Sequence, residues 1–167
     1  GAETPRQGVR PAAAIAALVL LQAPSVAGPV YISVTTVPGF MRLTDTTTFG
    51  PLAWRGGLVL ASDDAGFGGL SGLALGPDCG SLVAVSDTGR WYRAELRYGD
   101  GRLAGLAAAE TAPLLDDRGR PATSKWGGDA EALADLGGGR YLVGFERQTR
   151  IGAYDLGKSG LQARFQL

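Results

Sequence analysis

The stretch GGLSGLALGPDCGSLVAVSDTGRWYRAEL, residues 68–96, decides the fold because the chain repeats its pattern sixty residues later. The second copy is GDAEALADLGGGRYLVGFERQTRIGAYDL, residues 128–156. Laid over each other without a gap, at a constant offset of 60, the copies are identical at seven positions: Gly68/Gly128, Leu73/Leu133, Ala74/Ala134, Leu82/Leu142, Val83/Val143, Arg90/Arg150 and Leu96/Leu156. Self-similarity at a fixed spacing indicates a repeat architecture.

Each copy contains the same order of predicted elements: a short apolar strand, a glycine-rich turn, a second apolar strand, a polar turn and a third strand. A repeated antiparallel meander of this kind is typical of a β-propeller blade. The connection over residues 97–126 is long enough to add a fourth strand and a loop toward the next blade. Its segment LAGLAAAET, residues 103–111, has a short helix as the alternative, which the neighbouring glycines disfavour.

The sequence therefore predicts an all-β fold, a partial β-propeller with about two to three blades of antiparallel meanders in this chain. A propeller closes with at least four blades, so closure needs further chain, and we expect this sequence to be a piece of a longer protein. Two more strands are predicted before the repeats, at residues 31–37 and 57–62, with a loop over residues 44–51 between them.

Composition and charge exclude several classes of function. The chain has 167 residues, 45% of them hydrophobic, and a formal net charge of zero, which fits one globular domain and argues against nucleic acid as a partner. It contains no histidine, so a self-contained Ser-His-Asp triad is excluded. Ser71 lacks the final glycine of a nucleophile elbow and precedes a strand, and we predict that it is not a nucleophile. The single cysteine, Cys79, is predicted to be a turn residue.

The first 27 residues have the pattern of a secretion signal. Arg6 and Arg10 precede an apolar stretch over residues 11–21, and a small-x-small site ends at Ala27. A membrane anchor is the alternative, but the apolar stretch is shorter than the roughly 20 residues that cross a bilayer. We predict an exported protein, periplasmic or secreted, with no stable membrane anchor and a mature domain over residues 28–167.

Four stretches together resemble a bacterial family known as esterase-like activity of phytase: WRGGLVLASDDAGFGGLSGLAL (54–75), LVAVSDTGRWYRAEL (82–96), GDAEALADL (128–136) and LVGFERQTRIGAYDL (142–156). The phytase-like domain of that family is regarded as a propeller, of which this chain would form the N-terminal part. The resemblance implies an exported hydrolase of small-molecule phosphate esters that works with calcium. The stretches that form the active site of classical alkaline phytases are not found in this sequence.

The two repeats differ where a propeller carries its ligand-binding face, because small residues of the first copy give way to polar and charged ones in the second. The gap-free overlay matches Gly69, Ser71, Ser86 and Asp87 with Asp129, Glu131, Glu146 and Arg147. Asp129 and Glu131 are two residues apart, so on an extended strand their side chains point to one face.

Paired carboxylates suit calcium, which takes oxygen ligands. We therefore predict Asp129, Glu131 and Asp87 as metal ligands. Two alternatives stay open: Asp129 caps a turn while Glu131 pairs with Arg147, and the Asp87 side chain bonds to nearby backbone amides.

Catalysis is predicted to depend on Glu131, Glu146 and Arg147, since without histidine a proton must pass to a carboxylate, a lysine or metal-bound water. Arg147 and Lys125 are the predicted phosphate-binding residues. Lys125 and Trp126 are expected to form one wall of a cleft. The competing hypothesis is a non-catalytic periplasmic propeller that binds a ligand or a partner protein on the same face.

Three further side chains are predicted to have structural roles. Arg150, which matches Arg90 across the repeats, is expected to stabilise a blade. Trp54 and Trp91 are expected to pack between blades.

Overall fold

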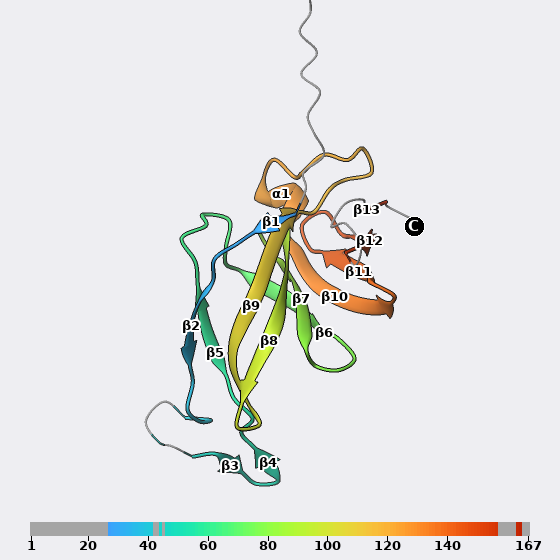
Figure 1. Cartoon of the computed structure of the whole chain (residues 1–167). Helices are drawn as coiled ribbons and strands as arrows, with labels where there is room; N and C mark the ends of the chain where they lie inside the picture. Colours follow the sequence, from blue (N-terminus) through green and yellow to red (C-terminus); the bar gives the residue numbers. More distant parts are fainter. Residues whose placement is uncertain (1–26, 42–43, 45, 157–162, 165–167) are drawn as a thin grey trace, which may run out of the picture.

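The computed structural model describes residues 27–41, 44, 46–156 and 163–164, and this part of the chain is all β apart from one helical turn. Two antiparallel sheets dominate it (Figure 1). The helical turn, α1 (Lys125–Gly128), lies in the connection between them. The predicted all-β class is confirmed.

The first sheet contains the first repeat and the strand that follows it. Its strands run in consecutive antiparallel order, and a short N-terminal strand pairs with the far edge: β6 (Leu70–Leu75), β7 (Ser81–Ser86), β8 (Arg90–Gly99), β9 (Arg102–Pro113) and β1 (Gly28–Pro29). The segment LAGLAAAET lies within β9, so it is the predicted fourth strand and not a helix.

The second sheet repeats this meander. Its strands are again consecutive and antiparallel: β10 (Ala130–Gly137), β11 (Arg140–Phe145), β12 (Arg150–Asp155) and β13 (Ala163–Arg164). Within the described ranges the two sheets stand side by side and do not close into a ring (Figure 1). Repeated four-stranded meanders are therefore present, and the propeller itself remains a proposal.

The overlay without a gap is wrong at the middle strand. Leu73 pairs with Ala84, but its counterpart Leu133 pairs with Val143 and not with Gly144. The offset between copies is thus 60 for the first and third strands and 59 for the middle one. The turn between β10 and β11 is one residue shorter because consecutive glycines at positive φ, Gly137 to Gly139, allow a tighter reversal.

The corrected register changes which site residues are equivalent. The amide of Asp87 donates to the carbonyl of Gly69 at 2.9 Å, and the amide of Glu146 donates in the same way to Asp129 at 3.0 Å. Asp87 is therefore the counterpart of Glu146, and Arg147 has no equivalent at Asp87.

The hydrophobic core lies between the two sheets. β10 lies along β6 and β7, and the approach is close enough that a Cβ on Gly72 would stand 2.8 Å from the backbone nitrogen of Leu133. Both sheets contribute to one cluster of buried side chains: Val83, Val85, Trp91, Ala112, Ala130, Tyr141, Val143, Phe145 and Tyr154. Trp91 packs between the sheets as predicted.

Trp54 does not pack there, which corrects the second part of that prediction. Its ring meets Phe40 edge to face at 5.0 Å, and its Nε1 donates to the carbonyl of Val37 at 3.1 Å. These contacts belong to the segment before the first repeat, because the tryptophan follows the small hairpin of β3 (Thr48–Phe49) and β4 (Leu52–Ala53).

The two predicted N-terminal strands form a separate ladder. β2 (Ser33–Thr36) pairs antiparallel with β5 (Leu58–Ala61), each a little shorter than the sequence indicates. The β3–β4 hairpin between them lies at the opposite end of the molecule from α1 (Figure 1). The predicted signal segment lies outside the described residues except for Ala27. No helix in the described residues has the length and apolar character needed to span a membrane.

Candidate functional site

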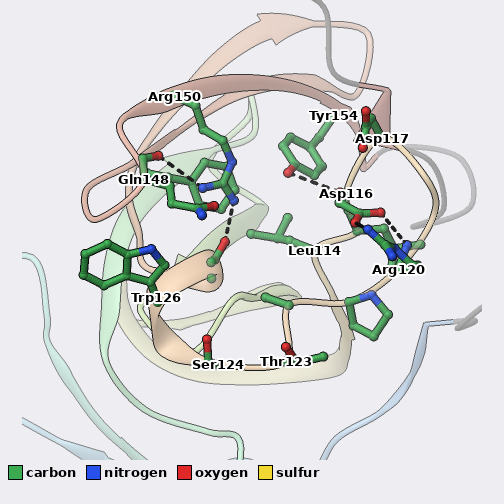
Figure 2. A pocket seen from close by; sticks show the side chains of 16 residues that line it. Leu114, Asp116, Asp117, Arg120, Thr123, Ser124, Trp126, Gln148, Arg150 and Tyr154 are labelled. Atoms are coloured by element: carbon green, nitrogen blue, oxygen red, sulfur yellow. Dashed lines mark hydrogen bonds and ion pairs between the residues drawn. The ribbon is translucent and has the colours of Figure 1, made fainter.

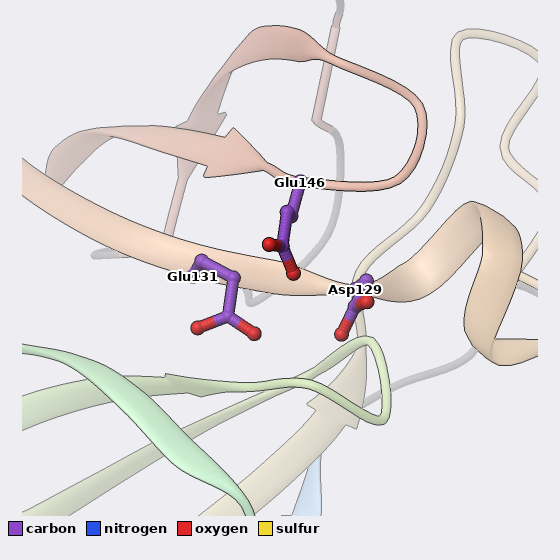
Figure 3. A group of neighbouring side chains, drawn as sticks. All are labelled: Asp129, Glu131 and Glu146. Carbon is purple, nitrogen blue, oxygen red and sulfur yellow. The ribbon is translucent and has the colours of Figure 1, made fainter.

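Three carboxylates come together where the second sheet meets α1. Asp129 follows the helical turn, Glu131 lies on β10, and Glu146 follows the last residue of β11 (Figure 3). One oxygen of each lies within 4.8 Å of the other two. The pairing of Ala130 with Phe145 brings the start of β10 to the end of β11, and a bulge between Ala130 and Ala132 interrupts the strand there. We call this group the carboxylate cluster.

Asp129 is the buried member of the cluster, with only 2% of its surface exposed, whereas Glu131 and Glu146 are exposed. It precedes β10 instead of sharing an extended strand with Glu131, so the two carboxylates meet across the bulge and not through strand alternation. Arg147 Nε donates to Asp129 Oδ2 at 2.6 Å, while Oδ1 has no hydrogen-bond partner among the described residues. The predicted alternative pair of Glu131 with Arg147 is therefore wrong, because Arg147 binds Asp129.

A chain of ion pairs connects this cluster to the first sheet. Lys125 Nζ stands 3.8 Å from Asp129 Oδ1 and donates to Asp87 Oδ2 at 2.6 Å. The hydrogen bond to Asp87 raises the pKa of Lys125. Asp87 lies outside the carboxylate cluster, since its carboxylate binds Lys125. Of the three predicted metal ligands, the structure brings Asp129 and Glu131 together and adds Glu146 in place of Asp87.

The site carries an excess of negative charge. Its acidic residues are Asp87, Asp129, Glu131 and Glu146, and its basic residues are Lys125 and Arg147. Four carboxylates against two cations leave a formal charge of minus two. Such an excess attracts a divalent cation to this edge of the sheets.

Ser71 has a structural role between the sheets. Its Oγ, on β6, donates to the backbone carbonyl of Ala130 on β10, the residue between Asp129 and Glu131. This contact fixes the strand that carries the cluster against the first sheet.

A pocket with a volume of about 600 Å³ lies beside the cluster, between the loop after β9 and the turn between β11 and β12 (Figure 2). Leu114, Phe145 and Tyr154 line it together with Trp126, Gln148 and Arg150. Lys125 is not part of this lining, because its side chain turns to Asp87. The prediction that Lys125 and Trp126 share one wall is therefore wrong.

Arg150 and Arg90 both anchor the start of a third strand, in agreement with their matched positions. Arg150 donates to the carbonyls of Gly127 and Gln148, and its guanidinium lies 3.7 Å from the centre of the Phe145 ring. Arg90 Nε donates to Thr111 Oγ1 at 3.2 Å within the first sheet. Arg150 therefore ties α1 to the second sheet, while Arg90 acts inside the first.

Sequence reasoning missed the pocket because the loop over residues 114–124 has no periodic pattern. The loop does contain one local pattern that indicates an ion pair, because Asp116 and Arg120 are four residues apart. Asp116 accepts from Arg120 Nε at 3.1 Å and Nη2 at 2.9 Å. Burial raises the pKa of Asp116, but hydrogen bonds from Arg120 and Arg118 outweigh it and lower the pKa overall.

Repeated antiparallel meanders with an acidic cluster at their junction define the class of protein: an all-β repeat protein with a polar site between its sheets. A family model described as Phytase-like, esterase-like activity of phytase, matches residues 65–167, more than half of the chain. The chain therefore belongs to this phytase-like family. Neither the curated proteins nor the solved structures contained a significant match.

Proposed function

We propose that the protein is an exported phytase-like hydrolase that acts on small-molecule phosphate esters with calcium bound at the carboxylate cluster. Membership of the phytase-like family supports the hydrolase class. The secretion pattern of residues 1–27 supports a periplasmic or secreted location. We also propose that the two sheets are neighbouring blades of a β-propeller, which the repeated meanders and their shared core support.

The observation that carries the proposal is the spacing of the three carboxylates. Calcium binds oxygen at about 2.3–2.6 Å, so two ligands on opposite sides of one ion lie about 5 Å apart. Oxygens of Asp129, Glu131 and Glu146 within 4.8 Å of one another fit that limit. The buried Oδ1 of Asp129 also lacks a hydrogen-bond partner among the described residues, as expected of an atom reserved for a ligand.

The two cations beside the cluster fit the binding of a phosphate. Arg147 and Lys125 hold Asp129 and Asp87 at 2.6 Å and are themselves about half exposed. Each therefore keeps donors that face solvent, and a guanidinium can bind two phosphate oxygens at once. When bound, calcium supplies positive charge that neutralises the phosphate and lowers the pKa of a water.

The exposed carboxylates are suited to move the proton. Glu131 or Glu146 accepts a proton from the water whose oxygen attacks phosphorus, and the bond from phosphorus to the ester oxygen breaks. The leaving oxygen, on the opposite side of phosphorus from that water, takes a proton from solvent and departs as an alcohol, while the carboxylic acid gives its proton back to solvent. No histidine is required for this sequence of steps, in keeping with the composition of the chain.

Hydrolysis of a chromogenic phosphate monoester, with excess calcium and with EGTA, tests the proposal. We expect EGTA, Glu131→Gln and Glu146→Gln each to lower kcat/KM about tenfold or more, a loss of roughly 1.4 kcal/mol of transition-state stabilisation. Glu95→Gln is the matched control, because Glu95 is an exposed carboxylate that pairs with Arg97 away from the cluster. Activity that neither EGTA nor the two substitutions lower would contradict the metal-assisted mechanism.

A second candidate function is favoured by the same ion pairs. Both proposed phosphate-binding cations already neutralise carboxylates, Arg147 at Asp129 and Lys125 at Asp87. A periplasmic propeller that binds a ligand or a partner protein without catalysis needs no more than these two ion pairs on its binding face. Calcium binding without any hydrolysis of phosphate or carboxyl esters would favour this candidate.

A further inference from the structure

The pocket beside the cluster has the properties of a small-molecule site of its own. Its volume of about 600 Å³ lies within the range of about 300–1,000 Å³ typical of ligand sites. Its lining includes no residue of the carboxylate cluster. Leu114, Phe145 and Tyr154 are buried residues that line it with apolar side chains. Trp126, 59% exposed, stands at one side (Figure 2).

Arg150 is the unusual charged group of this pocket. Its guanidinium uses one donor on Gly127 and one on Gln148, which leaves other N–H groups of the five that arginine carries. Among the described residues no carboxylate lies within ion-pair distance of it, whereas Arg120, in the same pocket, is neutralised by Asp116. A half-buried cation beside apolar groups is stabilised by an anion that enters the pocket.

We propose that this pocket binds a small organic anion, with its charged group on Arg150 and its apolar body on Leu114, Phe145 and Tyr154. Gln148 and Arg150 lie on one side of the pocket, while the exposed carboxylate of Asp117 lies on the other (Figure 2). The charges therefore direct the anionic end of the ligand toward Arg150. Burial raises the pKa of Tyr154 to about 12, so its phenol stays neutral at physiological pH and does not repel an anion.

Titrations of the isotope-labelled protein with benzoate, phenyl phosphate and benzyl alcohol, followed by amide NMR shifts in EGTA, test this assignment. We expect benzoate to shift amides of residues 114–128 and 145–154 and to bind about tenfold more tightly than benzyl alcohol, which has the ring without the charge. Phenyl phosphate distinguishes a carboxylate site from a phosphate site. EGTA keeps the result independent of the carboxylate cluster, so failure here and failure of the proposed hydrolase are separate outcomes.

Two substitutions of Arg150 test whether its guanidinium binds the charged group of the ligand. Arg150→Gln is expected to weaken benzoate about tenfold, and Arg97→Gln, a control at an exposed arginine that pairs with Glu95 outside the pocket, to change it less than about twofold. Because Arg150 also holds Gly127, Arg150→Lys is the second variant, and it should keep the preference for benzoate over benzyl alcohol. Equal affinity for benzoate and benzyl alcohol in the wild type, or shifts centred on Asp129 and Glu131, would overturn the proposal.

Discussion

Trp91→Ala is expected to lower the free energy of unfolding by about 3–5 kcal/mol, the usual loss when a buried tryptophan becomes alanine. The Trp91 side chain is fully buried in the core between the two sheets. Its removal leaves a cavity that Val85 and Val143, both fully buried, are too rigidly placed in opposite sheets to fill. Urea unfolding followed by circular dichroism in the far ultraviolet measures the loss.

Two matched variants separate packing from other effects of the indole. The Nε1 of Trp91 has no hydrogen-bond partner among the described residues, so Trp91→Phe removes part of the ring volume without losing a hydrogen bond and should cost clearly less unfolding free energy than Trp91→Ala. Trp126→Ala removes an exposed tryptophan and should change stability by less than about 0.5 kcal/mol. If Trp91→Ala were as stable as Trp126→Ala, the two sheets would not share a core.

Arg147→Gln is expected to cost about 1–3 kcal/mol of unfolding free energy in EGTA, because it leaves the buried carboxylate of Asp129 without its guanidinium partner. Breaking a fully buried ion pair lowers the free energy of unfolding by more than this, but that larger loss is not expected here because Arg147 is 47% exposed. Added calcium should then raise the melting temperature of this variant more than that of the wild type. The reason is that both oxygens of Asp129 become free to bind the ion.

Arg97→Gln is the control for this experiment. Arg97 pairs with Glu95 at 2.6 Å, but both side chains are more than half exposed, so the loss should stay below about 1 kcal/mol with no response to calcium. An Arg147→Gln protein whose melting temperature calcium leaves unchanged would mean that Asp129 is a structural ion-pair residue and not a metal ligand.

The repeat predicts most of the fold because strand alternation and glycine turns are local properties. The predicted first strand of each copy is present as β6 (Leu70–Leu75) and β10 (Ala130–Gly137), and the predicted fourth strand of the first meander is β9 in the long connection. The overlay misses one residue in the turn before β11, because turn length depends on how many glycines adopt positive φ. That single residue shifts the counterpart of Asp87 in the second copy from Arg147 to Glu146.

The sequence predicts which residues form the site better than it predicts how they are arranged. The sequence correctly predicts that the carboxylates of Asp129 and Glu131 lie together, but they meet across the bulge at the start of β10 and not through the strand alternation that the spacing indicates. The partner of Arg147 and the position of Lys125 depend on contacts across sheets and on α1, which no local pattern contains. The pocket around Arg150 is a product of tertiary packing for the same reason.

Titration calorimetry with calcium chloride is the most direct test of the central claim, that the carboxylates at the start of β10 and the end of β11 form a calcium site. The wild type should bind one ion, Glu131→Gln and Glu146→Gln should each weaken the binding about tenfold or more, and Glu95→Gln should bind like the wild type. Circular dichroism confirms that each variant is folded. No binding by the wild type, or equal affinity in all four proteins, would contradict the claim.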